Sequence, residues 1–295
     1  MNASPGPPEI FDSRRRAAKL ARGESSFAAA DFLHVRAAEN AVHSLEVILR
    51  DFPQVVDLSA RPGPFARRLA DSATAGRVGA VEVVGDGTAR AAPGAAPLGL
   101  PDQSRDLIVS LMSLHWANDL PGALTQIRRA LRPDGLFLGT LLGAGTLKEL
   151  RGVLTQAELE VRGGAQARVS PFADGFDGAA LLQRAGFALP VADVDRLTVR
   201  YSDLYALVRD LRAMGETNAL AGPIRPMTRG MLARAAEIYA ERHGESDGRI
   251  PATFEIIHLA GWAPHESQQK PLPRGSAKVR LADALGVKEW TGEED

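Results

Sequence analysis

The chain has 295 residues, of which 45% are hydrophobic and 24% are charged, and its formal net charge is −1. This composition is typical of a globular protein with a sizeable core, and the near-zero charge provides no field that would attract nucleic acid. The sequence contains no cysteine, which excludes disulfides, zinc–thiolate sites and a thiol nucleophile. It has neither an apolar run of about 18 residues nor a signal-peptide core, so we expect a cytoplasmic protein without a transmembrane segment.

Two helices are predicted before the first strand. Residues 11–22 form a basic segment that carries Arg14, Arg15, Arg16, Lys19 and Arg22. This segment fits either a solvated helix or a docking surface for an acidic partner or an anionic membrane face. Residues 32–49 place apolar side chains at helical spacing, which indicates an amphipathic helix.

The stretch QVVDLSARPGPFARRLA, residues 54–70, organises the α/β part of the chain. A short β-branched run ends in Asp57, and a Pro- and Gly-bearing turn then leads into a helix, which is the opening unit of a nucleotide-binding fold. The usual acidic-x-Gly-x-Gly-x-Gly spacing appears here as Asp57, Ser59, Arg61 and Gly63. Two of three glycine positions therefore carry side chains where the backbone should approach a ligand closely. The sequence predicts a recognisable but damaged cofactor loop.

Further strands are predicted at residues 78–84, 106–111, 136–142 and 191–201, with helices between them. The alternating segment 251–262 is typical of an antiparallel edge strand. We therefore expect an α/β fold with a mostly parallel sheet and an antiparallel last strand.

We divide the chain into N-terminal helices (1–50), the α/β domain (51–266) and a polar tail (267–295).

Several side chains are candidates for a site at the carboxyl ends of these strands, where open α/β sheets bind ligands. Asp86 follows the second strand and is either a ligand for ribose hydroxyls or a turn residue between glycines. Leu111 is the last residue of the predicted central strand and His115 follows it; His115 is the candidate general base, or else it lines the top of the sheet. Glu149 and Arg151 either face the same cleft or form a solvated pair.

Two stretches carry a family resemblance, DLIVSLMSLHW followed by ND and LP, and LRPDGLFLGTLLG. Their order after the glycine turn resembles class I S-adenosylmethionine-dependent methyltransferases. Later segments are more specific, namely GTLKELR (145–151), SPF (170–172), MGETN (214–218), PAT (251–253) and HESQ (265–268). Together with IFD (10–12) and the arginines at 14–16, they look like the bacterial counterparts of mitochondrial complex I assembly factor 5. The malonyl-acyl-carrier-protein methyltransferases of biotin synthesis are a more distant match.

The resemblance implies a Rossmann-like fold, S-adenosylmethionine as cofactor and a protein partner, a subunit of respiratory complex I (NADH:ubiquinone oxidoreductase). It also implies arginine hydroxylation, although no His/carboxylate spacing of the facial-triad kind occurs and we expect no metal site. The alternative is an active methyltransferase for a malonyl-acyl-carrier-protein-type or other substrate.

Two departures from the family pattern bear on the cofactor. The first is the loop with Ser59 and Arg61, and the second is the interval of only 20 positions between Asp86 and Asp106. Family members use roughly twice that interval for a helix and a third strand, and a crossover alone needs about a dozen residues. We expect the third strand–helix unit to be lost or shortened, and S-adenosylmethionine binding to be weak or lost.

Overall fold

The computed structural model describes residues 9–85, 98–172 and 178–269, together with the single positions 279, 283 and 286. The chain divides into two compact units, Met1–Pro264 and His265–Asp295. The sheet and the helices discussed below belong to the first unit. In the second unit, His265 Nδ1 lies 2.6 Å from Ser267 Oγ, which forms a local turn contact.

A six-stranded sheet with the order β2-β1-β3-β4-β6-β5 forms the centre of the first unit. The strands are β1 (Val55–Asp57), β2 (Val81–Val83), β3 (Arg105–Ser110), β4 (Leu131–Leu142), β5 (Ala188–Tyr201) and β6 (Ile250–Trp262). Pairs β1–β2, β1–β3 and β3–β4 are parallel, whereas β6 is antiparallel to both β4 and β5. The predicted fold class, a mostly parallel sheet with an antiparallel last strand, is confirmed.

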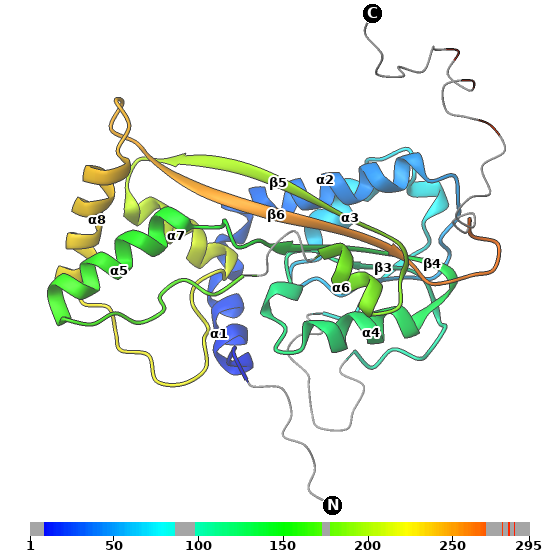
Figure 1. The fold of residues 1–295 in the computed structure, drawn as a ribbon, viewed down its shortest axis with the longest axis horizontal. Coiled ribbons are helices and arrows are strands. Elements are labelled where there is room, and N and C mark those ends of the chain that lie inside the picture. Colours follow the sequence, from blue (N-terminus) through cyan, green and yellow to red (C-terminus); the bar gives the residue numbers. More distant parts are fainter. Residues whose placement is uncertain are drawn as a thin grey trace, which may run out of the picture. The chain divides into compact units, whose positions relative to one another are not determined.

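The expected position of that last strand was wrong. β6 is an inner strand between β4 and β5, and the edge is formed by β5. Burial explains the difference, because β6 is buried almost continuously while β5 alternates between half-buried and exposed residues. Figure 1 shows these two strands running together beyond the others, toward α7 and α8.

Helices cover both faces of the sheet, with α2 and α3 on one side and α4 and α6 on the other (Figure 1). The α-helices are α1 (Ser13–Gly23), α2 (Phe32–Val47), α3 (Gly63–Ala70), α4 (Leu120–Ala130), α5 (Lys148–Arg162), α6 (Gly178–Arg184), α7 (Leu204–Met214) and α8 (Arg229–His243). Short 3-10 turns are η1 (Glu24–Ala29), η2 (Ala75–Arg77) and η4 (Leu114–Trp116). None of the helices in the described part of the chain is long and apolar enough to cross a membrane.

Alternate residues of the inner strands fill two apolar cores. Leu107 and Val109 of β3 belong to the core under α2 and α3, whereas Ile108 belongs to the core under α4 and α6. This follows from the two-residue period of a strand, which sends successive side chains to opposite faces. A continuous apolar sequence such as residues 106–111 is therefore buried on both sides.

The described residues contain no strand beyond β2, which forms the other edge of the sheet. β3 is the next described strand in the chain, and residues 86–97 between them lie outside the description. The expectation that a third strand–helix unit is lost or shortened falls on these residues and stays a prediction.

Candidate functional site

The turn after β1 is held together by its own neighbours. Asp57 is fully buried, and its Oδ1 accepts a 2.8 Å hydrogen bond from the Ser59 N–H. Ser59 Oγ accepts from the Leu111 N–H at 2.8 Å, and the Ala60 N–H donates to Ser113 Oγ at 2.7 Å. Amide groups that a glycine loop would offer to a ligand are thus engaged inside the protein.

Two buried side-chain atoms of this turn have no hydrogen-bond partner among the described residues, Arg61 Nε and, in the carboxyl of Asp57, Oδ2. Burial raises the pKa of this carboxyl, although its hydrogen bonds from Ser59 oppose the shift.

Arg61 closes the turn against the N-terminal helices. Its guanidinium forms an ion pair with Glu24, donates to the Leu20 carbonyl oxygen at 2.7 Å and lies 4.8 Å from the ring centre of Phe27. The residue is only 7% exposed, so a long cation occupies the interior where the family pattern has no side chain. Gly63, the retained glycine, is the first residue of α3.

His115, the candidate base, lies on η4 and has no exposed side-chain surface. Its Nε2 is 2.9 Å from Glu216 Oε2, and its Nδ1 accepts from the Leu142 N–H at 3.4 Å. The hydrogen-bond network therefore assigns the neutral tautomer with its proton on Nε2. Both ring nitrogens are used within the protein, an arrangement that favours a lining role at the top of the sheet.

Glu216 is the acceptor at the centre of this network. Besides His115, it accepts from Arg16 at 3.0 Å and from the indole N–H of Trp116 at 3.1 Å. Burial opposes ionisation of Glu216, but the Arg16 charge and the His115 contact outweigh it and hold its pKa at about 2. Arg16 also donates to the Gly215 carbonyl oxygen at 2.5 Å and lies 4.6 Å from the Trp116 ring centre. Neither interpretation of the basic helix anticipated a buried arginine.

His34 is a buried residue of α2 that lies close to the same charges. Burial lowers its pKa to about 4, and this outweighs the opposing effect of Glu216. Its ring packs edge-on against Phe27 at 4.9 Å, the residue that also contacts Arg61.

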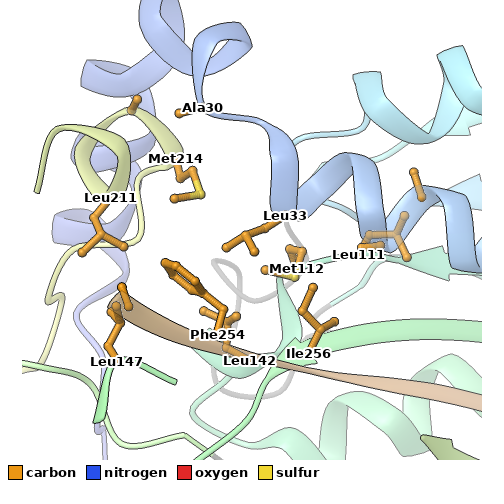
Figure 2. Close-up of a cluster of buried hydrophobic side chains, with 14 of the residues drawn as sticks. Ala30, Leu33, Leu111, Met112, Leu142, Leu147, Leu211, Met214, Phe254 and Ile256 are labelled. Atoms are coloured by element: carbon orange, nitrogen blue, oxygen red, sulfur yellow. The ribbon is translucent and has the colours of Figure 1, made fainter. Parts of the chain in front are cut away.

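Apolar side chains fill the space between the ends of the inner strands and α7. Figure 2 shows Leu111 and Met112 from the end of β3 gathered with Leu211 and Met214 of α7 and with Phe254 of β6. Leu111, a predicted cofactor contact, thus places its side chain in the core and only its N–H on the Ser59 turn.

The resemblance motifs meet in this region although they are far apart in the sequence. Asn118 Oδ1 accepts from the N–H groups of Ile10 and Phe11, and its Nδ2 donates to the Phe11 carbonyl oxygen. The Asp12 N–H donates to the carbonyl oxygen of Ala219. Hydrogen bonds therefore hold segments 10–16, 115–118 and 214–219 together.

Glu149 and Arg151 fit neither predicted role. Glu149 is buried and accepts from the Thr253 hydroxyl at 2.6 Å, which ties α5 to β6. Arg151 donates to the carbonyl oxygens of Ala144 and Thr146. Glu149 therefore holds α5 to β6 and Arg151 holds the turn before α5, and the two side chains are not a solvated pair.

Of the predicted site residues, the structure brings Asp57, Ser59 and Leu111 together at one turn, with Arg61 directed to α1 and η1. Asp86 lies outside the described residues. No group of three metal-ligating side chains occurs within the described ranges. Sequence reasoning missed Glu216, whose only signal was its place in the segment MGETN.

Comparisons with known proteins agree with this geometry. A family model described as a methyltransferase domain matches residues 55–139. The chain is 35% identical over 299 residues to "Arginine-hydroxylase NDUFAF5, mitochondrial" of Rattus norvegicus, which covers 96% of this chain and 85% of that protein.

Three further matches cover a smaller part of the chain. The Dictyostelium discoideum protein of the same name is 45% identical over 190 residues, which is 64% of this chain but only 44% of that relative. The chain also spans 56% of the length of the Danio rerio relative. A malonyl-[acyl-carrier protein] O-methyltransferase of Halorhodospira halophila is 36% identical over 189 residues, 64% of this chain and 61% of that protein.

The sheet order, its inner antiparallel strand and the acidic turn after β1 define a class I methyltransferase fold. Within that class, the chain belongs to the family of the arginine-hydroxylase NDUFAF5 proteins.

Proposed function

We propose that this protein acts in the cytoplasm as an assembly factor for a subunit of NADH:ubiquinone oxidoreductase, and that its binding of S-adenosylmethionine is weak or lost. Family membership supports the assembly role. The observation that carries the proposal is Arg61, whose buried side chain joins the cofactor turn to Leu20 and Glu24.

The residues at the turn do not fit S-adenosylmethionine as they stand. Three amide donors at Ser59, Ala60 and Leu111 already serve Asp57, Ser113 and Ser59. A ligand would have to replace these bonds and displace Arg61. If the ligand itself lacks two or three hydrogen bonds to the turn, at about 1–3 kcal/mol each, a micromolar site is weakened by orders of magnitude. The unpartnered Asp57 Oδ2 is a buried side-chain acceptor of the turn that a ligand donor could satisfy.

Calorimetric titration tests this half of the proposal. We expect no saturable binding of S-adenosylmethionine to the native chain at micromolar concentrations. Arg61→Gly should create binding, and Asp57→Asn in that background should reduce it. Glu24→Ala is the matched control, because it removes the ion-pair partner of Arg61 but leaves the Arg61 side chain in the loop. A micromolar dissociation constant for the native chain would contradict the proposal.

The biological half needs a deletion strain with two readouts. We expect the strain to lose NADH:ubiquinone activity without requiring biotin. The native gene and a gene that encodes Arg61→Gly should restore that activity equally. A biotin requirement with normal respiratory activity would instead support the alternative, methylation of a malonyl thioester, which the similarity to the H. halophila enzyme suggests.

A further inference from the structure

A large cavity lies between α1, α5, α7 and α8, and no residue of the cofactor turn lines it. Its volume is about 1210 Å³, above the range of about 300–1,000 Å³ for ordinary small-molecule pockets. Glu216 forms part of its wall, but both carboxylate oxygens of that residue already serve Arg16, His115 and Trp116. The cavity is therefore a feature separate from the cofactor turn, and its use goes beyond the assembly role proposed above.

The lining is strongly cationic, with seven Lys and Arg side chains against two carboxylates. Lys19 and Arg22 come from α1, where their spacing places them on one side of the helix, and Arg212 comes from α7. No ion pair between any of these three and a carboxylate occurs in the described part of the chain; the Lys19 ammonium donates only to the Thr217 hydroxyl, at 2.8 Å.

The environment of Lys19 shows that these charges act on one another. Burial lowers its pKa to about 8, and repulsion from Arg22, Arg15, Arg16 and Arg212 adds to the shift. A cluster of like charges that is partly withdrawn from water gains stability when an anion joins it. Among the described residues no carboxylate neutralises Lys19, Arg22 or Arg212, so this cluster is available to an external anion.

The other walls of the cavity are apolar. Leu150 and Leu154 of α5 contribute, as do Val208 of α7, Met227, and Leu232 of α8. Val208, Met227 and Leu232 are only partly buried, so they keep apolar surface that a ligand can cover. Arg168 also lines the cavity, but its charge is already paired with Glu158. The cavity thus joins an unneutralised cationic group to an apolar wall.

We propose that this cavity binds an amphiphilic anion, an acyl chain with a phosphate or carboxylate head group. The head group contacts Lys19, Arg22 and Arg212, and the chain lies along the α5 and α8 walls. An acyl ligand fits better than an acidic peptide because its single charged end and long apolar body match one cationic cluster beside one apolar wall.

Calorimetry with soluble probes tests the inference. The probes are dodecyl phosphate and dodecanoate below their micelle concentrations, with inorganic phosphate and dodecyl maltoside as controls for head group and chain alone. We expect at least one anionic probe to bind in the micromolar range and both controls to bind at least about tenfold more weakly. Binding of dodecyl phosphate alone would identify a phosphate head, and binding of dodecanoate alone a carboxylate head.

Matched variants locate the site. Lys19→Ala and Arg212→Ala should each weaken binding about tenfold or more, since each removes a charge-assisted contact. Lys148→Ala and Arg184→Ala, exposed cations outside the cavity, should change it less than about twofold. Arg212 is itself exposed, so its variant remains informative if Lys19→Ala does not fold.

Three results would overturn the proposal. The first is that neither anionic probe binds, and the second is that the cavity and control variants bind equally well. The third is that dodecyl maltoside, or a short acidic peptide, binds as tightly as the anionic probes; the peptide result would assign the cavity to a protein segment instead.

Discussion

Substitution of Glu216 by Gln changes one atom of the side chain but removes the acceptor on which the buried network depends. Both carboxylate oxygens accept, Oε1 from Arg16 and Oε2 from His115, while the Trp116 N–H lies within 3.4 Å of each. A Gln amide must point its NH₂ group at one of these donors. His115 cannot relieve the conflict by changing tautomer, because its Nδ1 accepts from the Leu142 N–H.

The expected loss of stability follows from the charge. The pKa of Glu216 is about 2 against an ordinary 4.5, so at about 1.4 kcal/mol per pKa unit the fold favours its carboxylate over a neutral group by about 3 kcal/mol. Removing one partner of a buried pair also leaves the other uncompensated, at about 3–5 kcal/mol. Arg16 is 3% exposed and would be the stranded charge. We therefore expect Glu216→Gln to lower the free energy of unfolding by about 3–5 kcal/mol.

Urea unfolding followed by circular dichroism measures this loss. Glu241→Gln, an exposed carboxylate on α8, is the matched control and should change stability by less than about 0.5 kcal/mol. Arg16→Met removes the stranded cation, so the double variant should be more stable than the sum of the two single effects by about 1–3 kcal/mol. A Glu216→Gln loss below about 1 kcal/mol, or strict additivity, would refute the description of Glu216 as the centre of the network.

Two further substitutions probe α2 and α8. The pKa of His34 is about 4 in the fold and 6.5 ordinarily, so the unfolded chain binds the extra proton and about 3 kcal/mol of stability is lost as pH falls from about 6.5 to about 4. His34→Phe should remove that slope and exposed His43→Gln should keep it, as measured by unfolding at a series of pH values; equal slopes would contradict the assignment. Thr228→Ala should cost about 1 kcal/mol in urea unfolding, because the Thr228 hydroxyl caps α8 by accepting from the Met231 N–H. Thr155→Ala, in mid-helix with its hydroxyl bonded four residues back, should be nearly neutral, and an equal loss in both would argue against capping.

Most strands and helices could be predicted because their signals are local. Apolar runs, the breaker at residues 62–64 and helical spacing placed most of these elements to within a few residues, although β4 begins at Leu131 and includes the Pro–Asp–Gly run at 133–135 that is typical of a turn. The order of the strands is not a local property. The alternation of residues 251–262 pointed to an edge, but β6 pairs with β4 on one side and β5 on the other, and its two faces pack into the two apolar cores.

The site was harder to predict because its contacts join distant segments. Arg14, Arg15 and Arg16 are adjacent in the sequence, yet only Arg16 points inward, and its partner Glu216 lies 200 positions away. Nothing in the local sequence distinguishes such an arginine from a solvated one. The replacement of two glycines by Ser59 and Arg61 is visible in the sequence, but the contacts of Arg61 with Leu20 and Glu24 could not be predicted from it.

Arg61 connects the turn after β1 to α1 and η1. It replaces backbone that could approach a ligand, and it supplies an ion pair, a carbonyl contact and a ring contact to the α1–η1 region. Arg61→Gly should therefore gain affinity for S-adenosylmethionine and lose about 2–3 kcal/mol of stability, the sum of a charge-assisted hydrogen bond and a cation–π contact. Glu24→Ala should lose less than about 1 kcal/mol, because Glu24 is 75% exposed and such ion pairs contribute little. Paired calorimetry and urea unfolding test the linkage. If Arg61→Gly gains affinity without losing stability, Arg61 only obstructs the cofactor and does not anchor α1. If it loses stability without gaining affinity, the hydrogen-bonded amides of the turn are sufficient to exclude the cofactor.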